Sequence, residues 1–166
     1  MTANFDGPDV LDVTLRDGSY VIDFQFTAHD TYTIGAALES VGVRWIEIGH
    51  GLGLNASNAG SGPAGASDES YLEAAADAIK TAKWGMFCIP GIARLEDVDM
   101  AASYGMHFIR IGTDVTNYER ARPFIERAKE KGLYVSYNAM KSYAVSPEEF
   151  AVAGAAVSNW GADIVA

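Results

Sequence analysis

The sequence is poor in cysteine and in basic residues, and each shortage excludes a class of protein. Cys88 is the one cysteine among 166 residues, so the chain has neither an internal disulfide framework nor a cysteine-built metal site. Lysine and arginine number 12 against 22 aspartates and glutamates, which gives a formal net charge of -10. Because nucleic-acid binding needs clustered basic side chains, this balance argues against a nucleic-acid partner.

Long apolar runs and a leader pattern are also missing. No stretch reaches the roughly 20 apolar residues that a membrane span requires. The first residues, Met1 to Asp6, lack the basic and apolar regions of a signal peptide. Hydrophobic residues make up 49% of the chain and charged residues 20%, an ordinary globular composition. We therefore expect a cytoplasmic protein without a membrane partner, built as one domain over residues 1–166.

Apolar, β-branched runs alternate with helical patterns along the chain. After a polar lead-in at residues 1–8, the expected strands are 10–15, 43–49, 84–89, 108–112, 133–139 and 163–166, and the expected helices are 28–41, a segment from 68, 95–104, 116–131 and 146–160. A period of about 25 to 30 residues predicts a parallel α/β fold. No phosphate-cradling glycine motif follows the first strand, which disfavours a dinucleotide-binding fold.

The number of repeats points to a barrel that is incomplete. A (β/α)8 TIM barrel normally needs about 250 residues, and this chain supplies about five βα units plus the start of a sixth strand. A chain that stops inside a strand is unusual for a natural domain. We expect a fragment, a truncated gene product, or the described part of a longer protein.

The first strand ends in the pair Arg16-Asp17, followed by Gly18. In βα-repeat folds the functional sites lie at the carboxyl ends of the strands. There Asp17 could bind a divalent cation, and Arg16 could hold a carboxylate or stabilise developing negative charge. The alternative is a salt-bridged pair that caps a turn.

Three further side chains near strand ends have two interpretations each. His50 precedes a loop rich in Gly, Ala, Ser and Asn at residues 50–67; it either handles substrate and protons or bonds to the backbone. Arg110 lies within a strand and needs a partner, which is either a substrate carboxylate or a barrel acid such as Glu47. Lys141 is either a Schiff-base lysine of a metal-free aldolase or a solvated surface residue.

The motif Thr14-Leu15-Arg16-Asp17-Gly18 resembles the signature of the DRE-TIM metallolyases. That superfamily includes 3-hydroxy-3-methylglutaryl-CoA lyase, isopropylmalate synthase and 4-hydroxy-2-oxovalerate aldolase. Further segments in the same order are similar to the aldolase branch: Ile46 to Gly51, Ile89 to Ile92, Ile109 to Thr113, and Met140 to Ser142. The resemblance extends from about residue 10 to the last residue.

This resemblance implies a metal-dependent carbon–carbon lyase that, in the complete enzyme, cleaves a 4-hydroxy-2-oxo acid to pyruvate and an aldehyde. Asp17 matches the family's ligand for Mn²⁺ or Mg²⁺, and Arg16 matches the arginine that stabilises the enolate oxygen. Glu47 completes the Asp-Arg-Glu set, and Ser142 falls where the aldolases place a serine near the keto acid. A hard cation polarises the carbonyl, and the guanidinium shares the enolate charge.

Three departures from the family pattern leave the substrate and the reaction open. The family's remaining metal ligands, a His-x-His pair, are expected beyond the last residue, because His29, His50 and His107 form no such pair. Tyr20 stands where the aldolases carry the histidine expected to act as the base. With a reference pKa near 10, a tyrosine there would act as an acid or an orienting group, or need a depressed pKa. Asp114 also replaces a family histidine.

Two alternative functions remain in view. A Claisen-type acyltransferase of the isopropylmalate synthase kind would condense acetyl-CoA with a 2-oxo acid, although Ser19-Tyr20 stand where the synthases tend to have Glu-Gln. An inactive barrel fragment would expose two sheet edges and self-associate. The expected partners are therefore a small 2-oxo acid and further copies of the chain in a homo-oligomer.

Overall fold

The computed structural model describes residues 9–166, so the predicted lead-in at residues 1–8 lies outside the described part. The strands are β1 (Leu11–Asp12), β2 (Trp45–Ile48), β3 (Lys83–Cys88), β4 (Phe108–Asp114), β5 (Tyr134–Met140) and β6 (Ile164–Val165). The α-helices are α1 (Ala28–Ser40), α2 (Asp68–Ala78), α3 (Leu95–Ser103), α4 (Arg122–Glu130) and α5 (Pro147–Asn159). Three short 3₁₀ helices add to these: η1 (Asp17–Ile22), η2 (Val115–Ala121) and η3 (Ser142–Ala144).

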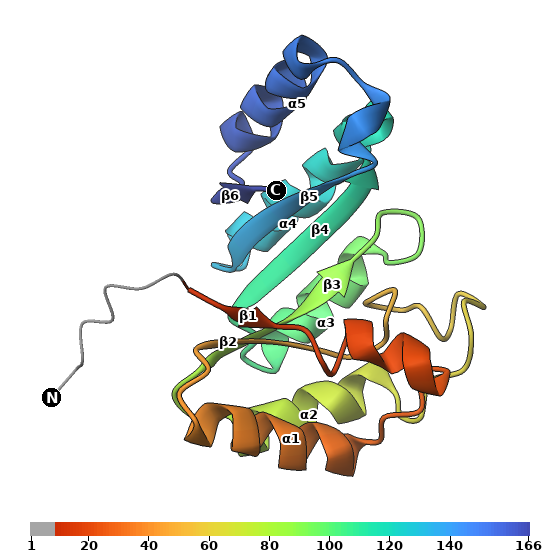
Figure 1. The fold of residues 1–166 in the computed structure, drawn as a ribbon, viewed down its shortest axis with the longest axis vertical. Coiled ribbons are helices and arrows are strands. Elements are labelled where there is room, and N and C mark those ends of the chain that lie inside the picture. The colour runs from red at the N-terminus through yellow and green to blue at the C-terminus, as the bar shows by residue number, and fades with distance from the viewer. Residues whose placement is uncertain (1–8) are drawn as a thin grey trace, which may run out of the picture.

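The six strands form one parallel sheet in which the spatial order is the chain order, β1-β2-β3-β4-β5-β6. The sheet curls, and a helix follows each of the first five strands (Figure 1). This arrangement is an incomplete TIM barrel, as the sequence predicts. Parallel strands bring their carboxyl ends to one rim of the sheet, and the loops after β1, β2, β4 and β5 meet there.

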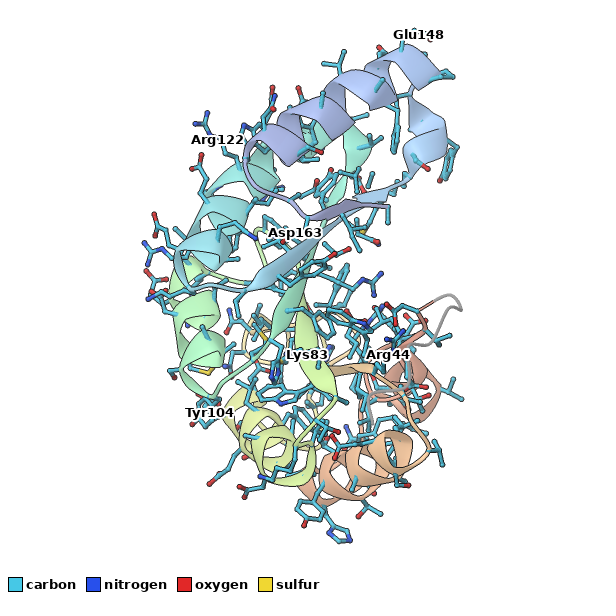
Figure 2. The ribbon with its side chains drawn as sticks, turned by 90° about the vertical axis from the view of Figure 1, so that its left-hand side faces the viewer. Arg44, Lys83, Tyr104, Arg122, Glu148 and Asp163 are labelled. Atoms are coloured by element: carbon cyan, nitrogen blue, oxygen red, sulfur yellow. The ribbon has the colours of Figure 1, made fainter. Side chains whose placement is uncertain are left out.

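Alternation along each strand separates two faces of the sheet. Helices α3 and α4 lie along one face (Figure 2). The side chains directed to the helical face are buried and almost all apolar: Ile46, Ile48, Met86, Cys88, Ile109, Ile111, Val135 and Tyr137. The alternate positions give the inner face of the curl, where the register places Glu47 opposite Gly85 and Phe87 opposite Arg110. Charged and aromatic side chains are thereby concentrated inside the partial barrel.

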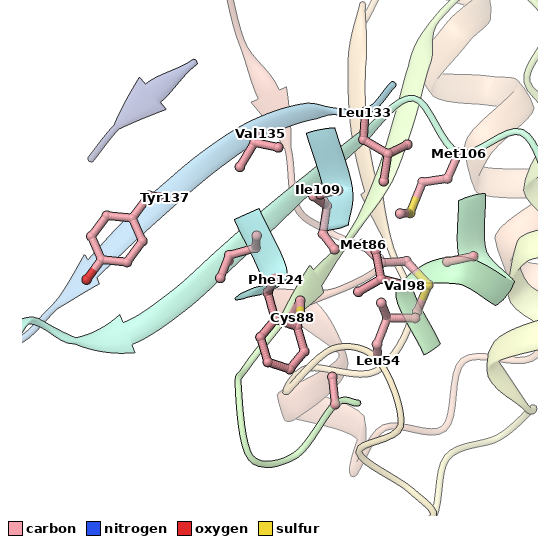
Figure 3. Close-up of a cluster of buried hydrophobic side chains, with 14 of the residues drawn as sticks. Leu54, Met86, Cys88, Val98, Met106, Ile109, Phe124, Leu133, Val135 and Tyr137 are labelled. Carbon is pink, nitrogen blue, oxygen red and sulfur yellow. The ribbon is translucent and has the colours of Figure 1, made fainter. Parts of the chain in front are cut away.

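The core between the sheet and its helices fixes the position of that inner face. Met86 and Ile109 of the sheet pack in one cluster with Val98 of α3 and Phe124 of α4 (Figure 3). Each of these side chains is at most 8% exposed. Full burial of one such side chain contributes about 1.5 to 3 kcal/mol, so the strands are held firmly against the helices.

Local hydrogen bonds explain where two of the predicted helices start. Thr27 accepts a hydrogen bond from the Asp30 backbone N–H, and the Asp30 carboxylate accepts one from the Thr27 N–H at the start of α1. Ser146 and Glu149 form the same reciprocal pair at α5, with Pro147 in the first turn. Among residues 9–166, none of the helices is both long and apolar enough to cross a lipid bilayer.

The predicted helix over residues 116–131 is wrong in its first third. A 3₁₀ helix, η2, covers Val115–Ala121, and α4 begins only at Arg122. Asn117 inside η2 has non-helical backbone angles. The cause is Pro123, which lacks an N–H and clashes with the turn before it, so a continuous α-helix through this point is unfavourable.

Candidate active site

The turn after β1 directs Arg16 and Asp17 to the carboxyl rim of the sheet. The carbonyl oxygen of Val13 accepts hydrogen bonds from the N–H groups of Arg16, Asp17 and Gly18 at 3.1, 2.7 and 3.3 Å. Three N–H groups on one acceptor bend the chain sharply and lead into η1. The segment after β1 therefore continues as the 3₁₀ helix η1, which carries Tyr20.

Arg16 from the turn after β1, Glu47 from β2 and Arg110 from β4 come together and form what we call the arginine–glutamate cluster. Glu47 Oε2 accepts hydrogen bonds from Arg16 Nε at 2.7 Å and from Arg110 Nη1 at 2.9 Å. The Glu47 side chain is fully buried, and the arginine side chains are 11% and 16% exposed. Arg110 also donates from Nη2 to Asn138 Oδ1 at 3.1 Å. Of the two alternatives for Arg110, the structure shows the pairing with Glu47.

The cluster carries more positive than negative charge. Two guanidinium groups share one carboxylate oxygen, and the nearby Asp17 carboxylate accepts from Arg16 Nη1 at 2.7 Å while remaining 58% exposed. Arg16 Nη2 has no hydrogen-bond acceptor within residues 9–166. Glu47 Oε1 is buried without a hydrogen-bond partner in the same part of the chain. Nη2 of Arg16 is thus a free donor suited to a small anion.

Tyr20 lies beside this cluster on η1. Its side chain packs edge-on against Phe24, with the ring centroids 5.0 Å apart, and the residue is 45% exposed. Partial burial raises the pKa of the Tyr20 phenol above its ordinary value of 10.0, against the opposing effect of the Arg16 charge. The phenol therefore stays protonated at neutral pH and is suited to donating a proton rather than removing one.

His50 is held at both ring nitrogens by its own loop. Nδ1 accepts a hydrogen bond from the Leu52 N–H at 3.0 Å, and Nε2 lies 3.2 Å from the Gly62 carbonyl oxygen. This pairing assigns the ring proton to Nε2. The ring stacks on Phe24 at 3.9 Å and is 1% exposed, and burial lowers its pKa. These contacts favour the backbone-bonded alternative over proton transfer by a free imidazole.

The candidate residues at the ends of β4 and β5 make no hydrogen bond to the arginine–glutamate cluster within residues 9–166. Lys141 Nζ pairs with Asp114 Oδ2 at 2.8 Å, which raises the pKa of the lysine above its ordinary value of 10.5. A Schiff-base lysine needs the opposite shift, so the surface alternative for Lys141 is favoured. Ser142 opens η3 and is exposed; in the described part of the chain no hydrogen bond joins it to the arginine–glutamate cluster.

Sequence reasoning missed two residues that touch the cluster, Phe87 and Asn138. The Phe87 ring lies under both guanidinium groups, at 4.9 Å from Arg16 Cζ and 5.5 Å from Arg110 Cζ. Strand alternation carries a signal for both residues, because each lies on the same face as Arg110 in a neighbouring strand. That signal becomes specific only when the register between strands is known.

A divalent metal would find one fitting ligand here. Asp17 presents an exposed carboxylate at the rim, of which one oxygen is bonded to Arg16. Within residues 9–166 no three His, Cys, Asp or Glu side chains gather as a metal site would require. Asp17 therefore fits as a single ligand.

Comparison with known proteins shows the family to which the chain belongs. The chain is 42% identical to an oxaloacetate decarboxylase of Mycobacterium tuberculosis over 99% of its own length and 48% of the relative. It is 36% identical to a 4-hydroxy-2-oxovalerate aldolase of Carboxydothermus hydrogenoformans and 37% identical to 4-hydroxy-2-oxovalerate aldolase 2 of Nocardia farcinica, over 94% of this chain and 46% and 45% of those proteins. The chain thus spans about half the length of these curated relatives. The HMGL-like family pattern matches residues 8–166, and the chain belongs to this family, within the DRE-TIM metallolyase superfamily.

Proposed function

We propose that this chain supplies the enolate-stabilising half of a metal-dependent carbon–carbon lyase that cleaves a 4-hydroxy-2-oxo acid to pyruvate and an aldehyde. The observation that carries the proposal is the free Nη2 donor of Arg16, whose guanidinium is held by the buried Glu47 next to the exposed carboxylate of Asp17. Relatives named 4-hydroxy-2-oxovalerate aldolase, matched over about half their length, support the same assignment.

Arg16 binds the oxygen on which negative charge develops. When the C3–C4 bond breaks, its electron pair moves toward the C2 carbonyl and forms an enolate. The Nη2 donors of Arg16 stabilise the enolate oxygen. Glu47 fixes the guanidinium through Nε, and Arg110 acts by holding Glu47 rather than by presenting its own bonded edge. A divalent cation held in part by Asp17, Mn²⁺ or Mg²⁺ in our proposal, would polarise the substrate carbonyl. Ser142 remains a proposed substrate contact.

Proton transfer separates two possible reactions. Aldol cleavage requires a base that removes the proton from the 4-hydroxyl group. Tyr20 has a raised pKa, and both ring nitrogens of His50 are engaged. In our proposal a solvent water molecule therefore takes the 4-hydroxyl proton during aldol cleavage. Tyr20 is assigned to the later step, in which its O–H protonates C3 of the enolate and the phenolate regains a proton from water.

The same residues support decarboxylation of a 2-oxo acid that carries a carboxylate on C3. Loss of CO₂ leaves the bonding electron pair in the enolate, and no hydroxyl proton has to be removed. Arg16 and Tyr20 would then stabilise and protonate the enolate as before. A protonated Tyr20 in place of a basic histidine favours this second candidate, and the relative named oxaloacetate decarboxylase agrees with it.

The experiment compares the two reactions in the full-length protein. Metal-depleted enzyme is supplied with Mn²⁺ or Mg²⁺ and with either 4-hydroxy-2-oxopentanoate or oxaloacetate, and pyruvate is followed with a coupled dehydrogenase. Acetaldehyde identifies the aldolase and CO₂ identifies the decarboxylase. Because oxaloacetate also decays with free metal, the surface variant Arg122→Lys serves as a positive control and Arg16→Met as a negative control. No pyruvate above the Arg16→Met rate from either substrate would refute the proposal.

Two other outcomes belong to the alternatives predicted from sequence. Release of free thiol from acetyl-CoA would instead support the Claisen-type acyltransferase. We also propose that the protein is a homo-oligomer, since β1 and β6 each end the sheet without a further neighbour among residues 9–166. Light scattering that finds a monomer would refute that assembly.

A further inference from the structure

The arginine–glutamate cluster has a charge imbalance that its own three residues do not resolve. Arg16 Nε and Arg110 Nη1 both donate to the same oxygen, Glu47 Oε2, so the two guanidinium cations are held next to each other. Their side chains are 11% and 16% exposed, and water screens their repulsion poorly at such burial. Asp17, which is 58% exposed, and the neutral amide of Asn138 each bind only one of the two guanidiniums, so a group that lies against both would add to their stabilisation.

The Phe87 ring is in position to do this. It extends from β3, which lies between β2, the strand of Glu47, and β4, the strand of Arg110. The ring centroid is 4.9 Å from Arg16 Cζ and 5.5 Å from Arg110 Cζ. The face of an aromatic ring carries negative charge density and attracts a guanidinium at such distances, more strongly where water is excluded. Phe87 itself is 5% exposed.

The surroundings of Phe87 fix the orientation of its ring. A Cβ on Gly112 of β4 would lie 2.5 Å from the tip of the ring, so only glycine leaves room for it there. The Phe87 carbonyl oxygen accepts a hydrogen bond from the Leu54 N–H at 2.9 Å, which ties the backbone to the loop of residues 50–67. A Cβ on Gly53 would overlap this same carbonyl oxygen. Gly112 and Gly53, on two other segments, are thus both required to be glycine by their contact with Phe87.

We propose that Phe87 is a positioning residue: its ring holds the Arg16 guanidinium in the plane that leaves Nη2 free for the enolate oxygen. The expected effect on kcat rests on the proposed function, whereas the expected effect on the position of the Arg16 side chain rests on the geometry alone. Phe87 touches Arg16 and Arg110 but is assigned no contact with the substrate. Its effect should therefore appear in the step that generates the enolate charge rather than in substrate capture.

The test changes the charge distribution of the ring without changing its shape. Pentafluorophenylalanine placed at position 87 nearly preserves the ring size but reverses the charge on its face. Phe87→Tyr retains a cation-binding ring, and Phe87→Leu removes it. The matched control is Phe108, which is 3% exposed on the same inner face and packs over Gly85 as Phe87 packs over Gly112. Within residues 9–166 no guanidinium lies over the Phe108 ring.

The first readout is kinetic and uses full-length enzyme loaded with Mn²⁺. Pentafluorophenylalanine or leucine at position 87 should lower kcat by roughly tenfold with KM changed less than about twofold, and should weaken inhibition by oxalate, a mimic of the pyruvate enolate, by a similar factor. Phe87→Tyr and pentafluorophenylalanine at position 108 should match the wild type. An unchanged kcat with the fluorinated ring at position 87 would overturn the proposal.

The second readout needs no activity, so it distinguishes failure of this inference from failure of the proposed function. Arg16 Cζ lies 4.9 Å from the Phe87 ring centroid, so the proton on the attached Nε should show a ring-current shift in the proton–nitrogen NMR spectrum. That shift should persist in Phe87→Tyr and disappear in Phe87→Leu, provided that circular dichroism shows both variants folded. If Phe87→Leu does not fold, the variant with pentafluorophenylalanine at position 87 is measured instead, and its Arg16 Nε–H signal should be broadened. A signal identical in all four proteins would refute the positioning role even if pyruvate is formed.

Discussion

Glu47→Gln tests whether the arginine–glutamate cluster is held by a buried charge. The substitution preserves the shape of the side chain but leaves two guanidinium groups facing a neutral amide. Removing one partner of a buried ion pair costs about 3 to 5 kcal/mol. Because the two arginine side chains keep 11% and 16% exposure, we expect the lower end, about 3 kcal/mol. For a chain of 150–250 residues this corresponds to a fall in Tm of about 6 to 12 °C.

Urea unfolding followed by circular dichroism gives the free energy, and the control is Glu126→Gln. Glu126 also pairs with an arginine, Arg122, at 2.8 Å, but the two side chains are 46% and 59% exposed. Exposed pairs of this kind contribute about 0 to 1 kcal/mol, so the control should unfold close to the wild type. If Glu47→Gln changes the free energy of unfolding by no more than Glu126→Gln, then the buried carboxylate is not what holds the two arginines.

Three further outcomes follow from the same geometry. Arg16→Lys retains the positive charge but removes the planar guanidinium and its free Nη2 donor, so kcat for pyruvate formation should fall by about 10²- to 10³-fold with little change in the unfolding midpoint. Gly53→Ala should cost about 2 to 4 kcal/mol in urea, whereas Gly60→Ala, at a similar positive φ but with nothing within 4 Å of its Cβ, should cost about 1 kcal/mol; equal costs would contradict the contact with Phe87. Burial raises the pKa of Asp68 from 3.8 to about 6, so the folded state binds the proton more tightly than the unfolded chain does. Stability should therefore drop by about 2 to 3 kcal/mol as pH rises from about 4 to above 6, and Asp68→Asn, measured across the same pH series, should lack that drop.

Much of the fold could be predicted because each βα unit carries its own local signals. Thr27 with Asp30 and Ser146 with Glu149 mark helix starts through bonds between residues three apart. The change from η2 to α4 was not predicted, because the apolar spacing continues through it. This periodicity was given more weight than the single proline at position 123. Periodicity reports which face is buried, but it does not report whether the backbone between two turns is continuous.

The candidate site could be predicted only as far as its residues lie in one motif or at a strand end. Arg16 and Asp17 were proposed from such a position, and Glu47 was proposed from its match to the family set. Phe87 and Asn138 were not identified, because their part in the site depends on which residue of the next strand lies opposite. That pairing is set by the packing of the whole sheet, and nothing within four or five residues of either position encodes it.

The agreement between strand order and chain order has a consequence for how the protein is made. A ribosome releases the chain from its N-terminus, so each new strand can dock directly beside the one completed before it. Glu47 emerges with only Arg16 available as a partner, and the second guanidinium, Arg110, follows 63 residues later. During this interval of synthesis the carboxylate is balanced by one arginine, and the Phe87 ring arrives before the second cation does. The order of translation thus assembles the counter-charge and the aromatic surface first, and adds the mutually repelling arginine last.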